Sequence, residues 1–223
     1  YPVLGHLPYV DIFETVRRDR MNVLDVLLED NKNEEDKNNE NSYQRFFFQE
    51  AFRNLYTSIR YSDTIEKTRV LLLTSSIPKE GKSLTNILLA KTLADLGIKV
   101  LLIDGDLRKP QIQVRLGLNN LMGLSNLLID SELSYGKVMQ NVKGYKNWKV
   151  ITGGITTPDP TKLLRSNRFK ELINEFRESG EFEVILFDSP PVLGLADTLL
   201  IAENVDGVII LVSLGFVDRD YPK

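Results

Sequence analysis

The stretch from Val70 to Ser83 constrains the fold of this chain more than any other, because an apolar run ends there in a turn and a helix-forming run follows. It reads Val-Leu-Leu-Leu-Thr-Ser-Ser-Ile-Pro-Lys-Glu-Gly-Lys-Ser. In phosphate-binding loops with this strand, loop and helix layout, backbone N–H groups point at phosphate oxygens. The spacing predicts that Lys82 reaches the β- and γ-phosphates and that the Ser83 hydroxyl ligates Mg²⁺.

The loop departs from the pattern Gly-x4-Gly-Lys-Ser/Thr at its first position, where Ser76 stands in place of glycine. We expect a nucleotide to contact the following residues: Ser76, Pro78, Lys79, Glu80, Gly81, Lys82, Ser83 and Leu84. The alternative is an ordinary turn before a helix, in which Ser83 caps the helix and Lys82 is solvated.

Length and composition favour one large α/β domain with an appendage. The chain has 223 residues, of which 42% are hydrophobic, and its net charge of −3 gives no general basic surface for nucleic acid. It has no cysteine, and its single histidine, His6, excludes a Ser-His-Asp triad or a histidine-rich metal site. No apolar run approaches the ~18 residues of a membrane span. Because Tyr1-Pro2 is not a natural start and no signal peptide is evident, we expect a fragment.

The first 42 residues are predicted to form a leader and a polar linker. Residues 1–12 mix prolines and a glycine with apolar residues and are expected to be extended, whereas residues 11–28 are compatible with a short helix. Residues 29–42 are nearly all Asn, Glu, Asp and Lys, which cannot bury apolar surface, so we predict a mobile linker there. The globular domain is expected over residues 43–223.

The spacing of apolar residues predicts an amphipathic helix over residues 43–60. The apolar positions recur at i, i+4, i+7 and i+11, namely Phe48, Phe52, Leu55 and Ile59. Glu50, Arg53 and Arg60 lie away from this stripe. Their charged face is either a solvated surface of a helix packed on the domain or a contact with a neighbouring subunit.

Short, continuous apolar runs predict a mainly parallel sheet covered by helices on both faces. The run that begins at Val70 is followed by others at residues 100–103, 150–152, 184–187 and 208–212. Helices are expected between them, one over residues 84–96 that ends at Gly97 and one capped by Ser166. This alternation indicates a doubly wound α/β fold, in which ligands bind beyond the carboxyl ends of the strands.

Three aspartates follow the predicted strand ends: Asp104, Asp106 and Asp188. Mg²⁺ in proteins takes few protein ligands and keeps several waters, so Ser83 and these carboxylates form a sensible set for holding it. Asp104 and Asp106 could instead belong to an ordinary polar turn. Arg108 and Lys109 either approach phosphate or are surface charges.

Several segments resemble, in order, the motifs of bacterial tyrosine kinases (BY-kinases). The Walker A, A′ and B motifs of that family are similar to Ser75-x-x-Pro78-x-x-Gly81-Lys82-Ser83, Leu101-Leu-Ile-Asp104-Gly-Asp106-Leu-Arg108-Lys109-Pro110 and Phe187-Asp188-Ser-Pro190-Pro191. Two further segments also look like the family, Gly123-Leu-Ser-x-Leu127-Leu128 and Gly153-Gly154-x4-Pro158-x-Pro160-x2-Leu163-Leu164. Residues 2–8 are similar to the stretch after the second membrane helix of these proteins.

The resemblance covers nearly the whole chain and implies a P-loop NTPase fold of the Par/Min-like type. It implies the kinase domain of a membrane-anchored polysaccharide co-polymerase that regulates capsule or exopolysaccharide export. The domain would lie at the cytoplasmic face of the bacterial inner membrane, the fragment itself being soluble. Its implied partners are further copies of itself, bound through the helix of Glu50 and Arg53 when membrane-anchored, and a transmembrane activator segment of the same or a separate chain. No nucleic acid is implied.

The expected activity is an ATP- and Mg²⁺-dependent protein tyrosine kinase. Lys82 would stabilise charge on the transferring phosphoryl group, and Ser83 would bind Mg²⁺. Asp106 and Asp188 would hold its waters. Asp104 is the candidate to orient or deprotonate the tyrosine of a neighbouring subunit, although Asp104 and Asp106 could exchange roles. The alternatives left open are a non-kinase ATPase switch and a nucleotide-binding scaffold of the export machinery.

Three departures from related families matter. Par- and Min-type ATPases carry a signature lysine at the position of Ile77, and its absence argues against them. The BY-kinase helix motif Glu-x-x-Arg-x-x-Arg reads here Glu50-x-x-Arg53-x-x-Tyr56, so its last arginine is missing. The family's C-terminal tyrosine cluster is not seen either, since Tyr221 is the only tyrosine after Tyr145, so the phospho-acceptor tail is either cut off or was never present.

Overall fold

The computed structural model describes residues 2–8, 23, 40–61 and 70–214. The chain divides into two units, one of residues 1–66 with 114–117 and one of residues 67–113 with 118–223. The helix predicted over residues 11–28 lies outside the described residues except for Val23, as does the linker over residues 29–39. The division into a leader of residues 1–42 and a domain of residues 43–223 therefore stays a prediction. No helix within the described ranges is long and apolar enough to cross a membrane.

In the first unit, helix α3 (Glu40–Tyr61) confirms the predicted amphipathic helix. It begins three residues earlier than expected, so residues 40–42 belong to the helix and not to a linker. Phe52, Leu55 and Ile59 are buried, and the Phe48 ring lies 5.0 Å from that of Phe52. The apolar stripe thus has the burial that its spacing predicts.

The second unit is built on a six-stranded sheet in the order β3-β4-β2-β5-β1-β6. Its strands are β1 (Val70–Ser75), β2 (Val100–Asp104), β3 (Gln140–Asn141), β4 (Trp148–Ile151), β5 (Val184–Asp188) and β6 (Gly207–Leu211). All neighbours pair in parallel except β3, which runs antiparallel to β4. The five predicted strands are confirmed to within two residues. Strand β3 was not predicted, because two polar residues carry no strand pattern.

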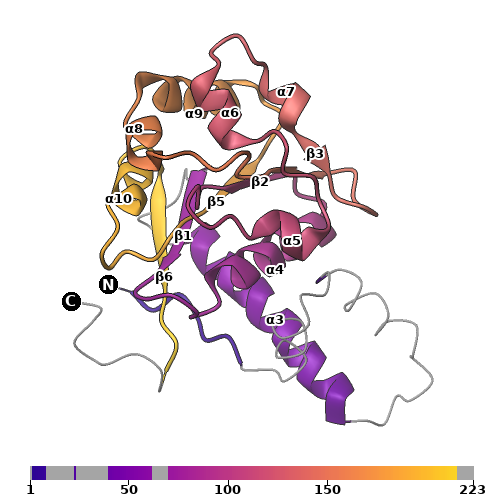
Figure 1. Ribbon diagram of the computed structural model, residues 1–223. Helices are drawn as coiled ribbons and strands as arrows, with labels where there is room; N and C mark the ends of the chain where they lie inside the picture. Colours follow the sequence, from indigo (N-terminus) through magenta and orange to yellow (C-terminus); the bar gives the residue numbers. More distant parts are fainter. Residues whose placement is uncertain (1, 9–22, 24–39, 62–69, 215–223) are drawn as a thin grey trace. The chain divides into compact units, whose positions relative to one another are not determined.

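The helices cover both faces of this sheet, as the continuous apolar strands predict. They are α4 (Lys82–Asp95), α6 (Leu124–Ile129), α7 (Tyr135–Val138), α8 (Pro160–Leu164), α9 (Asn167–Glu178) and α10 (Asp197–Ala202). A further helix, α5 (Ile112–Leu116), includes residues of both units. Helix α4 packs on β1, β2 and β5, while α6, α8, α9 and α10 lie on the opposite side (Figure 1). Alternate strand side chains such as Leu72, Ile103 and Phe187 form one core with α6, α8, α9 and α10.

Local signals set the ends of two helices as predicted. The Ser166 hydroxyl accepts a hydrogen bond from the N–H of Phe169 and caps α9, whose apolar face is fully buried. Helix α4 ends before Gly97, which has φ +83° and whose N–H donates to the carbonyl of Ala94. Glycine suits that left-handed conformation because it has no Cβ.

The carboxyl ends of β2, β5 and β1 lie side by side in the middle of the sheet. In the strand register, Asp188 of β5 stands opposite Leu73 of β1 on one side and Asp104 of β2 on the other. The doubly wound topology therefore brings the predicted phosphate loop and the aspartates to one edge, where such folds bind ligands.

Candidate active site

The side chain of Glu80 stabilises the loop between β1 and α4 by two hydrogen bonds. One of its carboxylate oxygens accepts a hydrogen bond from the N–H of Ile77 at 2.8 Å, and the other accepts from the N–H of Ser213 at 2.9 Å. The Glu80 side chain is thus committed to the protein, and only its main chain is left for a nucleotide. Lys79 and Gly81 both have positive φ, +73° and +94°, which gives the loop its sharp turn.

Lys82 and Ser83 are the first two residues of helix α4, and both lie in the site. The N-cap of α4 is Gly81, which has no side chain, and only 14% of the Lys82 side chain is exposed. The alternative of a Ser83 cap with a solvated lysine is therefore wrong. The Lys82 Nζ lies 3.8 Å from the Oδ2 of Asp106, on the neighbouring loop.

Asp188, at the end of β5, is fully buried and only half satisfied. Its Oδ1 accepts a hydrogen bond from the side-chain amide of Asn86 at 3.2 Å, whereas its Oδ2 is buried without a hydrogen-bond partner. Burial raises the pKa of Asp188, and the Lys82 charge and the nearby Ser83 hydroxyl offset part of that rise. A desolvated oxygen with no partner is costly and is suited to a cation.

Asn86 is a site residue that our sequence analysis missed. Its amide nitrogen donates both to Asp188 and to the carbonyl of Phe187, at 3.1 Å, which fixes the carboxylate from the side of α4. The available signal was a polar residue one turn after Ser83, on a helix that is otherwise mostly apolar.

Asp104 also lies at a strand end beside Asp188, but both of its carboxylate oxygens accept hydrogen bonds from main-chain N–H groups. Its Oδ2 accepts hydrogen bonds from the N–H groups of Gln111 and Ile112 at 2.9 and 3.0 Å, and its Oδ1 accepts from that of Asp106 at 3.2 Å. Burial, and then the nearby charge of Asp188, raises its pKa well above the usual value. With no exposed surface, Asp104 shapes the turn after β2, and its geometry does not support contact with a substrate tyrosine.

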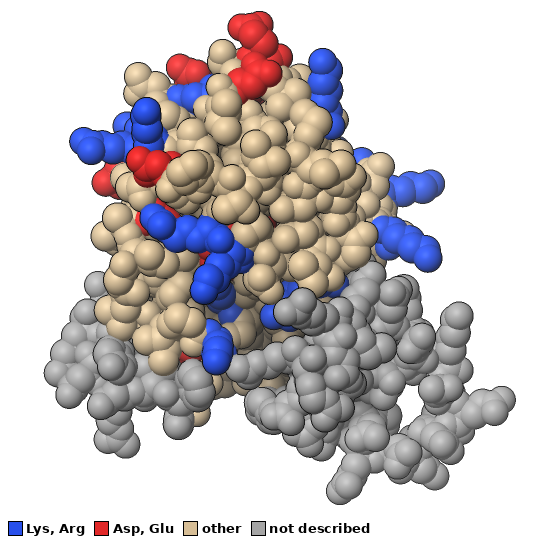
Figure 2. All heavy atoms as spheres, in the orientation of Figure 1, with Lys and Arg blue, Asp and Glu red and all other residues tan. Residues whose placement is uncertain are grey.

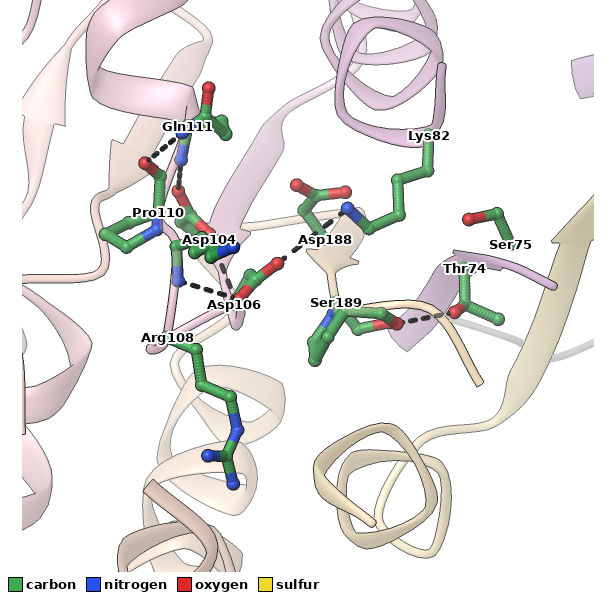
Figure 3. Close-up of polar contacts among 12 residues, drawn as sticks. Thr74, Ser75, Lys82, Asp104, Asp106, Arg108, Pro110, Gln111, Asp188 and Ser189 are labelled. Carbon is green, nitrogen blue, oxygen red and sulfur yellow. Dashed lines mark hydrogen bonds and ion pairs between the residues drawn. The ribbon is translucent and has the colours of Figure 1, made fainter. Parts of the chain in front are cut away.

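Asp106 faces the site. Its Oδ1 accepts a hydrogen bond from the N–H of Lys109 at 3.0 Å, and its Oδ2 is the atom that approaches Lys82. Burial raises the pKa of Asp106, while that N–H and the Lys82 charge act in the opposite direction. Figure 3 shows Lys82, Asp106 and Asp188 pointing toward one another from three different elements.

Gly105 makes the close approach of these loops possible. Its N–H donates to the carbonyl of Asp188 at 2.7 Å, and a Cβ at this position would lie 2.7 Å from the same oxygen. Any side chain at residue 105 would push the turn away from β5. The sequence showed the glycine but not this contact.

Arg108 is a surface charge, one of the two roles that we expected, and it is paired with another residue of the chain. Its Nε donates to Asp197 at 2.5 Å, and its Nη2 donates to Thr161 at 3.0 Å, so the side chain is an ion-pair partner in the protein and not a free phosphate ligand. In Figure 3 it points away from Lys82, Asp106 and Asp188. Lys109 is exposed, and its main chain completes the turn around Asp106.

The arrangement fits Mg²⁺ bound with its waters. Ser83, Asp106 and Asp188 supply oxygen donors at one place, and the unpartnered Oδ2 of Asp188 is the atom that such an ion would satisfy. Within the described ranges, no three carboxylates or imidazoles gather closely enough to form an all-protein metal cage. Figure 2 shows Lys and Arg side chains at the left and lower centre of the face in view, and further ones at its upper right and right edge.

Comparisons with known proteins identify the family. The model of the AAA domain family matches residues 79–217. Tyrosine-protein kinase YwqD of Bacillus subtilis (strain 168) is 34% identical over 171 residues, which are 77% of this chain and 70% of that protein. The kinase domain of Escherichia coli tyrosine kinase ETK matches with a TM-score of 0.71 and 28% identity, over 77% of this chain and 66% of that chain.

A structure with lower sequence identity shows that proteins outside the kinases share this fold. The septum site-determining protein MinD from Pyrococcus horikoshii, complexed with Mg-ADP, matches with a TM-score of 0.55 and 21% identity, over 65% of this chain and 57% of that chain. The P-loop NTPase fold is thus shared beyond the kinases, whereas the relatives at 34% identity are tyrosine-protein kinases. These relatives favour the kinase over a non-kinase ATPase or a scaffold, and the chain belongs to the family of bacterial tyrosine-protein kinases.

Proposed function

We propose that this chain is an ATP- and Mg²⁺-dependent tyrosine kinase domain that phosphorylates tyrosines of a neighbouring subunit and regulates capsule or exopolysaccharide synthesis and export. The observation that carries the proposal is the meeting of Lys82, Asp106 and Asp188 beside a phosphate loop, with one buried Asp188 oxygen lacking a partner. A cation and a polyphosphate complement these charges.

Each residue has a distinct role in this proposal. Lys82 and the N–H groups of the loop stabilise the negative charge of the transferring phosphoryl group. Ser83, Asp106 and Asp188 hold Mg²⁺ and its waters, and the bound ion supplies neutralisation of phosphate charge. Asp106 also accepts the hydrogen bond of the incoming tyrosine hydroxyl, because it is the carboxylate of the β2 turn that faces the site. Asp104 keeps the turn in shape.

Nucleotide binding has support from the fold. The MinD structure holds Mg-ADP, which shows that this fold accommodates a nucleotide with its metal in that protein. For this chain we assign the same kind of ligand to the loop of residues 76–84. The Arg108 side chain is left out of the assignment, since Asp197 already pairs with it.

Assembly at a membrane is the remaining part of the proposal. We assign the contact between subunits to the exposed face of α3, where Arg53 and Glu50 form an ion pair with an N–O distance of 2.5 Å. Support comes from the family, which implies oligomers anchored at the cytoplasmic face of the cell membrane and a transmembrane activator segment. The tyrosine that accepts phosphate would lie on the neighbouring subunit.

Replacing Lys82 with methionine tests the kinase assignment. We expect Lys82→Met to lower phosphoryl transfer by about 10²–10³-fold or more, the usual effect of removing one preorganised charge donor, without changing the thermal melt. The assay is phosphotyrosine formation with ATP and Mg²⁺ on the membrane-anchored full-length protein. Lys149→Met, on the β4 strand, is the control and should retain activity. Near-normal turnover in a well-folded Lys82→Met variant would show that this loop is not the phosphate-binding loop of a kinase.

A further inference from the structure

The first turn of α10 carries two adjacent buried polar side chains, Asp197 and Thr198, that hold two different loops of the site. The Asp197 carboxylate accepts hydrogen bonds from Arg108 Nε at 2.5 Å, from Arg108 Nη2 at 3.2 Å and from the Thr161 hydroxyl at 2.7 Å. This connects α10 to the turn after β2 and to the start of α8.

Thr198 holds the segment that follows Asp188. Its hydroxyl donates to the carbonyl of Pro190 at 2.6 Å, and the Thr74 hydroxyl donates to the same oxygen at 2.8 Å. The carbonyl two residues beyond Asp188 is thus fixed both by α10 and by the end of β1. Neighbouring residues of α10 therefore restrain the Walker A′ side and the Walker B side of the site.

Arg108 lies in the same turn that orients the side chain of Asp106. The Asp106 carboxylate closes it by accepting from the N–H of Lys109, so the orientation of the Arg108 backbone and that of the Asp106 side chain are linked. Below the turn, the Ile201 side chain of α10 lies 2.9 Å from the place where a Cβ of Gly105 would be. Helix α10 thus supports the turn by an ion pair and by direct packing.

The ion pair is built to stay formed. Asp197 has 1% of its side chain exposed and Arg108 has 39%, so a loss of the arginine would leave a buried carboxylate with no opposite charge beside it. Although burial by itself raises the pKa of Asp197, its hydrogen bonds with Arg108 and Thr161 bring the pKa below the usual value. The carboxylate therefore stays ionised at neutral pH.

We propose that Asp197 is a positioning residue of the kinase reaction, which acts through Arg108 to hold Asp106 at a fixed separation from Asp188. The inference rests on the proposed function, because that separation matters where both carboxylates serve one Mg²⁺. Side chains that orient metal-binding groups in this way typically contribute 10–100-fold to metal affinity or activity.

The test measures Mg²⁺ dependence in Asp197→Asn and Arg108→Lys. We expect Asp197→Asn to raise the Mg²⁺ concentration for half-maximal ATP binding by about tenfold or more, as measured by calorimetry, with little change in Mg²⁺-free binding. Arg108→Lys keeps the charge but loses the two-point contact, so it should give a smaller shift. The same shift should appear in the Mg²⁺ dependence of phosphorylation, with turnover partly restored at high Mg²⁺.

Asp206→Asn is the matched control. Asp206 forms an ion pair with Arg177 at 2.6 Å, beside the first residue of β1 and so at the opposite end of the strands from the site. Its loss should change the thermal melt but not the Mg²⁺ dependence.

A folded Asp197→Asn with normal Mg²⁺ dependence would overturn the inference, even if Lys82→Met confirmed the kinase. If Asp197→Asn does not fold, a normal Mg²⁺ dependence in Arg108→Lys would overturn it equally. If the wild-type chain binds Mg-ATP but phosphorylates nothing, the proposed function fails. The calorimetric shift then still decides whether Asp197 positions the site.

Discussion

Asp104 and Asp106 are two residues apart and chemically identical, yet they have different hydrogen-bond partners and therefore different roles. Asp104 has both oxygens bound to main-chain N–H groups, and Asp106 keeps one oxygen directed at Lys82. The candidate for contact with Mg²⁺ or with tyrosine is therefore Asp106. An asparagine at either position preserves the size of the side chain and so separates the two roles.

We predict that Asp106→Asn lowers turnover by about 10–100-fold and raises the Mg²⁺ requirement, because it removes a charge that faces the site. Asp104→Asn should retain most of the activity, since the amide oxygen can still accept from Gln111 and Ile112. Its cost should appear in the melting temperature, because the amide NH2 group then takes the place of Oδ1 and faces the N–H of Asp106, from which it cannot accept a hydrogen bond. Steady-state phosphorylation over a series of Mg²⁺ concentrations is the measurement. The opposite order of the two variants would return the catalytic role to Asp104.

Asp188 ties stability to pH. Because burial raises its folded pKa above the unfolded value of about 3.9, its contribution to stability falls as pH rises through the interval between those two values. With Mg²⁺ removed, we expect Asp188→Asn to be more stable than the wild type at pH 7, by on the order of 1 kcal/mol or roughly 2–4 °C. The difference should shrink toward pH 4.

Thermal melts in EDTA from pH 4 to pH 8 test this prediction. The same variant should lose the Mg²⁺-dependent part of ATP binding while keeping the Mg²⁺-free part, because the loop amides are unchanged. Equal losses under both conditions would mean that Asp188 is structural.

At the scale of elements, α6 is joined to the end of β4 by a contact between main chains. The N–H groups of Leu124 and Ser125 donate to the carbonyls of Thr152 and Gly153 at 2.8 and 3.0 Å. Gly123, which precedes α6, has room for no side chain, since a Cβ there would lie 2.1 Å from the carbonyl oxygen of Thr152. This explains why glycine opens one of the family's segments.

We predict that Gly123→Ala destabilises the fold by about 3 kcal/mol or more, because main chain must move to admit one methyl group. Gly136→Ala is the matched control. Gly136 lies in α7, and the atom nearest to its added Cβ is a serine hydroxyl at 3.7 Å, so this variant should be neutral. Urea unfolding of both variants provides the comparison. A Gly123→Ala variant as stable as Gly136→Ala would show that α6 can dock differently.

At the scale of the whole molecule, α3 bears on assembly. Glu50 and Arg53 already form an ion pair within the helix, and the hydroxyl of Tyr56 accepts from Arg60 at 3.4 Å. The position where the family carries its second arginine is thus occupied by a neutral side chain. Exposed ion pairs contribute only about 0–1 kcal/mol, but a closed ring repeats the loss of one at every contact.

We predict that this chain is mainly monomeric at micromolar concentration and that oligomers form when membrane anchoring raises the effective concentration. Light scattering over a dilution series measures this. Tyr56→Arg should shift the equilibrium toward oligomers, and Tyr61→Arg, on the same helix outside the motif, is the control. A stable ring in dilute solution would contradict the prediction and would give Tyr56 the role of the missing arginine.

The sequence by itself determined the parts of this protein that depend on near neighbours along the chain. All strands but β3 were recognisable because each is a short apolar run, and the cap of α9 was recognisable because Ser166 bonds only three residues away. The phosphate loop and the order of the aspartates were recognisable for the same reason. A parallel sheet brings the carboxyl ends of its strands to one edge whatever the strand order, so the sequence also predicted the location of the site.

Only the tertiary structure decided which groups at that location are free. Arg108 is paired by a residue 89 positions away, Asp188 is held by a residue 102 positions away, and Glu80 is bound by a residue 133 positions away. Burial and hydrogen bonding are set by whatever the fold brings near, and local sequence carries no record of it. The type of a side chain fixes its chemistry, but its partners fix whether that chemistry is available.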